Sequence, residues 1–123
     1  MVGVIDPDPV ARSGLRTLLH GLGVDVSTFD SAESYLLAAN GRHVACLIVD
    51  LLLPGMSGLE LLRRLRSAGN DVPVILLADE SDVPTAVAAM REGATDFIEK
   101  PYVDVAVLKP VQKLLRTPPT LPA

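Results

Sequence analysis

Four charged side chains that could do chemistry lie where apolar runs of the sequence end: Asp6, Asp8, Asp50 and Lys100. If these runs are parallel strands, their carboxyl ends meet at one edge of a sheet, which is where ligands bind in α/β proteins. Carboxylates gathered there repel one another unless a cation lies among them. We therefore expect a site in which Lys100 and a hard divalent ion such as Mg²⁺ balance the acids.

The composition indicates one domain with an aliphatic core. The chain has 123 residues, of which 49% are hydrophobic and 3% aromatic, so Val, Leu, Ile and Ala must fill the interior. The formal net charge is −4, and the basic residues are spread along the chain. This argues against nucleic-acid binding by this segment itself, because phosphate contacts need clustered Lys and Arg.

The cysteine content and the first residues bear on the compartment. Cys46, the single cysteine, lies in an apolar run and is predicted to be a buried small hydrophobe, not a disulfide partner or a reactive thiol. The start MVGVID lacks the features of a signal peptide, and no apolar run reaches the roughly 18 residues that span a bilayer. We expect a cytoplasmic protein with no membrane partner.

Strand-like and helix-like patterns alternate five times along the chain. The expected strands are residues 2–5, 24–29, 44–49, 72–77 and 96–99, and the expected helices are residues 9–22, 31–39, 57–68, 83–92 and 104–116. Ser31 and Asp82 are suited to cap the second and fourth helices, whereas Pro110 is expected to kink or restart the fifth. The alternation predicts a doubly wound five-stranded parallel sheet with helices on both faces.

Three stretches and their spacing resemble a response-regulator receiver domain: VIDPDPVARSGL, LIVDLLLPGMSGLELLRRLR and VPVILLADESDVPTAVAAMREGATDFIEKPY. The most specific features are the D-x-x-x-P-x-x-S-G block after a buried strand and the Lys-Pro pair after the last strand. The resemblance implies a flavodoxin-like (βα)5 fold over residues 1–116, with the Pro-rich residues 117–123 as a tail or the start of a linker. The pattern is most similar to receivers that carry a LuxR-type helix-turn-helix output domain.

The resemblance also implies roles for individual residues. Asp50 matches the aspartate that accepts a phosphoryl group from a histidine kinase. Asp6 matches the first of two adjacent acids that hold Mg²⁺, and Leu52 matches the position whose backbone carbonyl is a further ligand. Lys100 matches the lysine that pairs with the phosphoryl oxygens, and Phe97 matches the aromatic switch residue on the last strand.

Two positions depart from the pattern of the family. Pro7 stands where the second acid, a direct Mg²⁺ ligand, is expected, so we expect Mg²⁺ binding to be weak. Asp8 could reach the metal from the same loop, or it could cap the helix that begins at Pro9. Ala78 stands where a Thr or Ser hydroxyl is expected and offers the phosphoryl group only its backbone. The missing hydroxyl leaves space into which we expect Phe97 to turn without phosphorylation.

These residues favour a binding and switching module over a turnover enzyme. Its expected partners are a sensor histidine kinase and a second copy, bound through residues 83–92, 96–99 and 104–116, with DNA contacted only through an output domain outside this chain. The alternative is a pseudo-receiver of the same fold that docks or dimerises without phosphorylation. A small flavin-binding protein fits poorly, because the chain lacks a phosphate-binding loop after the first strand and aromatic residues to stack on a flavin.

Overall fold

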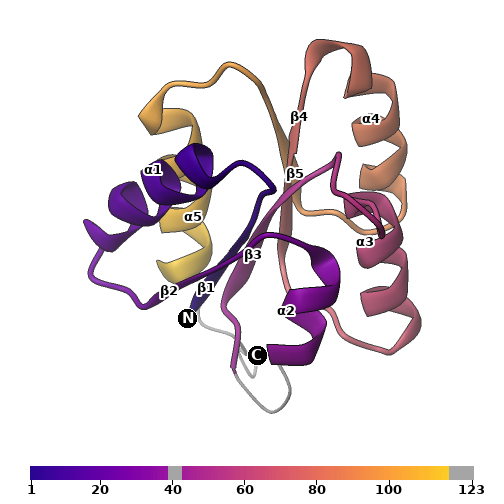
Figure 1. The fold of residues 1–123 in the computed structure, drawn as a ribbon, viewed down its shortest axis with the longest axis horizontal. Coiled ribbons are helices and arrows are strands. Elements are labelled where there is room, and N and C mark those ends of the chain that lie inside the picture. Colours follow the sequence, from indigo (N-terminus) through magenta and orange to yellow (C-terminus); the bar gives the residue numbers. More distant parts are fainter. Residues whose placement is uncertain (39–42, 117–123) are drawn as a thin grey trace, which may run out of the picture.

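Five parallel strands form one sheet in the order β2-β1-β3-β4-β5, as the computed structural model shows (Figure 1). The structure describes residues 1–38 and 43–116. The strands are β1 (Val2–Ile5), β2 (Val26–Phe29), β3 (Cys46–Asp50), β4 (Val74–Ala78) and β5 (Asp96–Glu99). The helices are α1 (Pro9–His20), α2 (Ala32–Ala38), α3 (Gly58–Ser67), α4 (Val83–Arg91) and α5 (Asp104–Arg116), and a 3₁₀ turn, η1 (Glu80–Asp82), precedes α4. The predicted fold class is confirmed.

Two layers of helices bury both faces of the sheet. α1 and α5 cover one face, and α2, α3 and α4 cover the other (Figure 1). Side chains of a strand alternate between the faces, so Cys46 and Ile48 of β3 pack toward α1 and α5, whereas Leu47 and Val49 pack toward the other three helices. This explains why the central strands are continuous apolar runs. Burial also raises the pKa of Cys46 to about 11, which keeps it a thiol, in agreement with its expected role as a buried hydrophobe.

β2, β3 and β4 each begin two residues later than expected, and β3 ends one residue later, at Asp50. β4 begins at Val74 and not at Val72, because Pro73 has no N–H to donate to a neighbouring strand. The carbonyl of Pro73 still accepts a hydrogen bond from the N–H of Leu47 at 2.8 Å, which sets the register at the start of β4. At its other end β4 includes Ala78, one residue further than expected.

The helix caps agree with the sequence in one case and differ in another. The Oγ of Ser31 accepts a hydrogen bond from the N–H of Ser34 at 3.1 Å, as expected of a cap for α2. The expectation that Asp82 caps α4 is wrong. Its side chain makes no capping hydrogen bond, because Asp82 is already part of the 3₁₀ turn η1 that leads into the helix.

The last helix continues through Pro110. α5 contains Pro110 inside its helical span, so the expected restart does not occur. The buried Val107 and Val111 on either side of the proline hold the helix against the sheet, which compensates for the lost hydrogen bond. The predicted tail, residues 117–123, and residue 39 of the second expected helix lie outside the described residues. In residues 1–38 and 43–116, every helix is too short or too polar to cross a membrane.

Candidate functional site

Asp6 and Asp50 lie side by side at the carboxyl edge of the sheet. β1 and β3 are neighbours in register, with Ile5 opposite Val49, so the residue that follows each of these two is brought to the same level. The strand order changes direction between β1 and β3, which makes this the topological switch point where α/β sheets bind ligands. Lys100 reaches the same place from the end of β5, with its Nζ 2.7 Å from Oδ2 of Asp50.

The carboxylate of Asp50 is held at both oxygens. Its Oδ1 accepts a hydrogen bond from the N–H of Leu52 at 3.1 Å, and its Oδ2 accepts one from Lys100. Burial lowers the pKa of Lys100, but the hydrogen bond to Asp50 and the negative charges of Asp50, Asp6 and Asp79 outweigh it, so the pKa is raised overall. Lys100 is therefore a stable cation, and it stays paired with a nearly buried carboxylate.

Asp6 is a buried acid with one oxygen that lacks a partner. The side chain is 1% exposed, and its Oδ1 accepts a hydrogen bond from the N–H of Asp8 at 2.9 Å. Its Oδ2 is buried without a hydrogen-bond partner among the described residues. Burial raises the pKa of Asp6 above its usual value, and the negative charges of Asp50 and Asp8 raise it further. The hydrogen bond from the N–H of Asp8 and the positive charge of Lys100 lower it, but by less. This acid is poised to receive either a proton or a cation.

Replacing Asp6 by Asn is expected to stabilise the fold at neutral pH. The folded pKa lies above the ordinary value of 3.8, so the contribution of Asp6 to stability is most favourable below that value and is lost as the pH rises through the folded pKa. Removing the charge should raise the free energy of unfolding at pH 7, on the order of 1 kcal/mol, because a buried neutral amide costs less than a buried carboxylate and does not repel Asp50.

Urea unfolding at pH 7 and near pH 4, without Mg²⁺, measures the effect of Asp6→Asn. The gain should shrink at the lower pH, where the wild-type carboxyl takes up its proton. Asp25→Asn, at an exposed position, is the control and should change little at either pH. An Asp6→Asn protein that is less stable than the wild type at pH 7 would contradict this account of the buried carboxylate.

The residues around Asp6 divide between the site and the first helix. The Oδ1 of Asp8 accepts a hydrogen bond from the N–H of Val10 at 3.0 Å, so Asp8 caps α1 and does not turn toward Asp50. Arg12, one turn into α1, donates from Nη1 to the backbone carbonyl of Asp6 at 2.8 Å. This contact was not predicted from the sequence, although a helical residue one turn beyond a cap is placed to fold back over the preceding loop. Pro7 is exposed and has no side-chain donor or acceptor.

The acids fit a divalent cation only in part. The unpaired Oδ2 of Asp6 beside the carboxylate of Asp50 is a suitable environment for a hard cation. In residues 1–38 and 43–116, however, no group of three or more His, Cys, Asp or Glu side chains is arranged to hold a metal ion. Pro7, at the position where the resemblance predicts a second acid, adds no side-chain ligand to this set.

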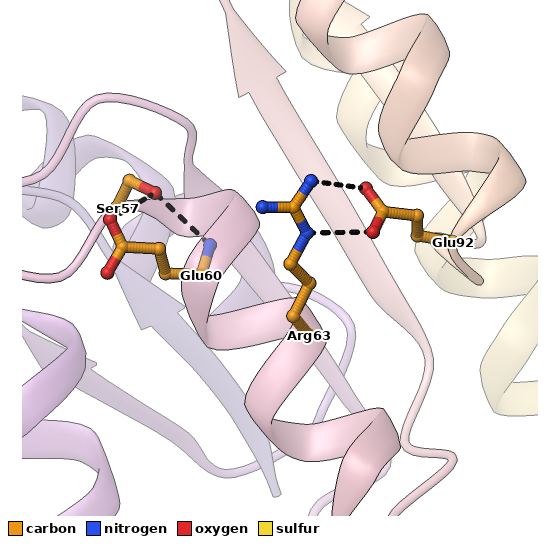
Figure 2. A network of polar contacts seen from close by, with 4 residues as sticks. All are labelled: Ser57, Glu60, Arg63 and Glu92. Atoms are coloured by element: carbon orange, nitrogen blue, oxygen red, sulfur yellow. Dashed lines mark hydrogen bonds and ion pairs between the residues drawn. The ribbon is translucent and has the colours of Figure 1, made fainter.

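The backbone after Asp50 is fixed by close packing at the start of α3. A Cβ on Gly58 would lie 2.7 Å from the carbonyl oxygen of Asp50, so only glycine allows α3 to begin this close to the strand end. Ser57 caps the helix by accepting a hydrogen bond from the N–H of Glu60 at 3.1 Å. Further along α3, Arg63 donates to both carboxylate oxygens of Glu92 at the end of α4, at 2.7 and 3.1 Å (Figure 2). α3 is thus anchored at both the site and the neighbouring helix.

Of the remaining predicted site residues, Ala78 and Phe97 lie on β4 and β5, and Leu52 lies in the loop after Asp50. Ala78 is 1% exposed, and its carbonyl accepts a hydrogen bond from the N–H of Lys100 at 2.8 Å. Phe97 is half-buried and packs against the apolar cluster that contains Ala78 and Ala86. The peptide bond between Lys100 and Pro101 is cis. Leu52, in the loop after Asp50, has an exposed side chain, with 57% of its surface accessible.

The sequence and the fold both match known proteins. Residues 2–112 match the family model described as the response regulator receiver domain. The chain is 37% identical over 113 residues to "Transcriptional regulatory protein FixJ" of Bradyrhizobium diazoefficiens, covering 92% of this chain and 55% of that protein. The chain thus spans about half the length of this curated relative.

Solved structures agree with this assignment. The crystal structure of full-length FixJ from B. japonicum matches 94% of this chain with a TM-score of 0.87 and 36% identity, over 57% of its own length. The receiver domain of NtrX from Brucella abortus matches 96% of this chain over its full length, with a TM-score of 0.88 and 30% identity. Together with the acidic site at the switch point, these matches show that the chain belongs to the response regulator receiver domain family.

Proposed function

We propose that this receiver domain accepts a phosphoryl group on Asp50 from the phosphohistidine of a sensor histidine kinase. The observation that carries the proposal is the Asp50 carboxylate itself, buried beside Asp6 and 2.7 Å from the Nζ of Lys100. A carboxylate oxygen of Asp50 attacks the phosphorus, the P–N bond breaks, and the imidazole nitrogen leaves with the bonding electron pair. The product is an acyl phosphate on Asp50, and no redox change occurs.

The other residues of the site position the reactants and balance charge. Lys100 would shift from the Asp50 carboxylate to the oxygens of the incoming phosphoryl group. Asp6, Asp50 and the backbone carbonyl of Leu52 would hold Mg²⁺, which supplies positive charge next to the phosphoryl oxygens when it is bound. Ala78 can offer only backbone groups. These roles describe a switching module without turnover of its own.

A phosphorylation-independent docking domain is the second candidate. Pro7 and Ala78 each remove a side-chain group that the resemblance predicts, one from the metal site and one from the switch. The absence of a cluster of three metal-binding side chains in the described part of the chain favours this candidate. The two candidates differ in whether Asp50 is modified at all.

The proposed test is labelling of the wild-type chain by a small phosphodonor such as acetyl phosphate. Intact mass spectrometry should detect the addition of one phosphoryl group in the presence of Mg²⁺. The adduct should be absent when Mg²⁺ is chelated, and hydroxylamine should remove it, as expected of an acyl phosphate. A chain that stays unmodified at saturating donor and Mg²⁺ would favour the docking domain.

The proposed partner surface is formed by α4, β5 and α5, and we infer a homodimer through it. Val87 and Met90 on α4 are large apolar side chains exposed at 45% and 37%.

The relative FixJ is named a transcriptional regulatory protein and is longer than this chain. We propose by analogy that DNA is contacted by an output domain beyond these residues and that the protein acts in the cytoplasm.

We further propose that the switch is biased toward its active arrangement. Burying the ring of Phe97 in the space left by the missing hydroxyl would gain about 1.5–3 kcal/mol, comparable with the gap between two conformations of a switch. The packing of Phe97 against the cluster around Ala78 supports this proposal. The face of α4, β5 and α5 would then be ready for a partner without phosphorylation.

Fluorescence of a Phe97→Trp variant tests this bias, because the chain has no tryptophan of its own. We expect short-wavelength, buried-type emission that changes little when beryllofluoride and Mg²⁺ are added. With Ala78→Thr in addition, emission should begin at longer wavelength and shift back on addition of beryllofluoride. Emission from a solvent-exposed indole in the variant that keeps Ala78 would contradict the proposal.

A further inference from the structure

Glu33 of α2 contacts the loop that follows Asp50, although the two segments are far apart in sequence. Its Oε2 accepts a hydrogen bond from the backbone N–H of Met56 at 3.0 Å. Met56 lies near the end of the loop 51–57, which also contains Leu52. A carboxylate from a neighbouring helix therefore holds the loop that directly follows the proposed acceptor.

The turn at Gly55 is shaped to admit this carboxylate. Gly55 has a φ of +73°, a conformation that favours glycine. A Cβ at this position would lie 2.5 Å from Oε2 of Glu33 and 3.3 Å from its Cδ. The absence of a side chain thus serves two purposes, because it permits the turn and lets the carboxylate lie against the backbone.

A helix cap and a buried aromatic contact fix the position of α2, which carries Glu33. Ser31 caps the helix, and Tyr35 is 3% exposed and packs edge-to-face against Phe29 with ring centroids 5.5 Å apart. The hydrogen bond from Met56 lowers the pKa of Glu33, as do its own backbone N–H and the charge of Arg64. The carboxylate is therefore ionised at neutral pH, when it is the strongest acceptor for a backbone N–H.

The same loop is tied down near the site at its two ends. The N–H of Leu52 donates to Asp50 Oδ1 at 3.1 Å, and the N–H of Gly58 donates to the carbonyl of Leu51 at 3.0 Å. The bond from Met56 to Glu33 adds an anchor between these ends. Releasing it would leave the loop held only at these two ends.

We propose that Glu33 is a positioning residue that holds the loop 51–57 so that the carbonyl of Leu52 stays beside the Asp50 carboxylate at the carboxyl edge of the sheet. The role rests on the proposed function, since it concerns the rate of phosphoryl uptake by Asp50 and the affinity for Mg²⁺. Glu33 is not among the residues proposed to hold the phosphoryl group or Mg²⁺, and it acts through the backbone of Met56. Its effect resembles that of residues that orient metal ligands. Loss of such a residue typically lowers metal affinity or activity 10–100-fold.

Three variants of the full chain test the role of Glu33. Glu33→Ala removes the acceptor and should slow labelling by acetyl phosphate with Mg²⁺ about tenfold. Glu33→Gln keeps an oxygen that can accept the N–H of Met56 and should label at nearly the wild-type rate. Leu37→Ala, on the same helix at a side chain that is 85% exposed, is the matched control and should label like the wild type. Hydrogen exchange at the Met56 amide should be faster in Glu33→Ala alone.

The outcomes separate this role from the proposed function. Equal labelling rates for the wild type and Glu33→Ala would overturn the positioning role and leave phosphorylation of Asp50 intact. Slow labelling of both Glu33→Ala and Glu33→Gln, with unchanged exchange at Met56, would also overturn it. A wild type that takes up no phosphoryl group would overturn the proposed function and this role with it. Thermal unfolding of each variant shows whether a slow rate reflects loss of the fold.

Discussion

Replacing Asp50 by Asn is expected to abolish phosphoryl uptake. The amide has neither the negative charge nor the nucleophilic oxygen of the carboxylate, so no acyl phosphate can form. Lys100 also loses the partner that lies 2.7 Å from its Nζ, and its side chain is partly exposed, so it can turn to water without unfolding the domain. Intact mass spectrometry after incubation with acetyl phosphate and Mg²⁺ should detect only the unmodified protein.

Asp79→Asn is the matched control for Asp50→Asn. Asp79 also follows a strand at the carboxyl edge of the sheet, but its side chain is exposed and it follows the end of β4. This variant should label like the wild type, because Asp79 influences Lys100 only through its charge. If Asp50→Asn labels as well as the wild type, the acceptor is another residue and the proposed assignment is wrong.

Replacing Pro7 by Asp is expected to tighten Mg²⁺ binding by about 10–100-fold or more. That range is typical for the loss of a residue that only supports a metal ligand, whereas the new Asp would be a direct ligand. The substitution adds a carboxylate next to Asp6, whose Oδ2 is buried without a hydrogen-bond partner among the described residues. The same charge adds repulsion when no metal is present. The variant should therefore unfold at a lower temperature than the wild type in chelator and at a higher temperature in millimolar Mg²⁺.

Calorimetric titration with Mg²⁺ measures the affinity of Pro7→Asp directly. Pro9→Asp is the control, since it adds the same charge at the exposed start of α1, two residues further from the site. It should bind Mg²⁺ about as weakly as the wild type. If the wild type binds Mg²⁺ with submillimolar affinity and Pro7→Asp does not change that affinity, then Pro7 does not weaken the site.

The order of strands and helices could be predicted because each element carries a strong local pattern. The run in β3 is apolar at every position before Asp50, which is typical of a strand covered on both faces. The observed boundaries and caps differ from the expected ones where backbone hydrogen bonding determines them. Pro73 cannot donate a hydrogen bond and delays the start of β4, and the 3₁₀ turn before α4 takes Asp82 away from its expected capping role. The continuity of α5 through Pro110 depends on tertiary packing, which periodicity does not report.

The site was predictable where the strand ends define it. Asp6, Asp50 and Lys100 come together because parallel neighbours bring their carboxyl ends to one edge. The choice between two roles for Asp8 could not be made from the sequence, since a residue before Pro9 suits both a cap and a ligand. The hydrogen bond from the N–H of Val10 to the Oδ1 of Asp8 shows that Asp8 caps the helix.

The contact between Glu33 and Met56 was not predictable from the sequence. The two residues are 23 positions apart and meet through a loop whose path depends on the positive φ of Gly55. The Pro54-Gly55 pair was a signal for a sharp turn, but nothing in it identified the helix against which the turn packs. Contacts of this kind depend on the relative placement of α2 and α3, which follows from how the whole sheet is covered.

Chemical mapping of the modified residue decides whether Asp50 carries the acyl phosphate. Borohydride reduces an aspartyl phosphate to homoserine, so the labelled protein can be reduced, digested and sequenced by mass spectrometry. We predict homoserine at position 50 alone, formed only when phosphodonor and Mg²⁺ were both present. Homoserine at the position of Asp6, Asp8 or Asp79, or reduced protein with every aspartate intact, would contradict the account.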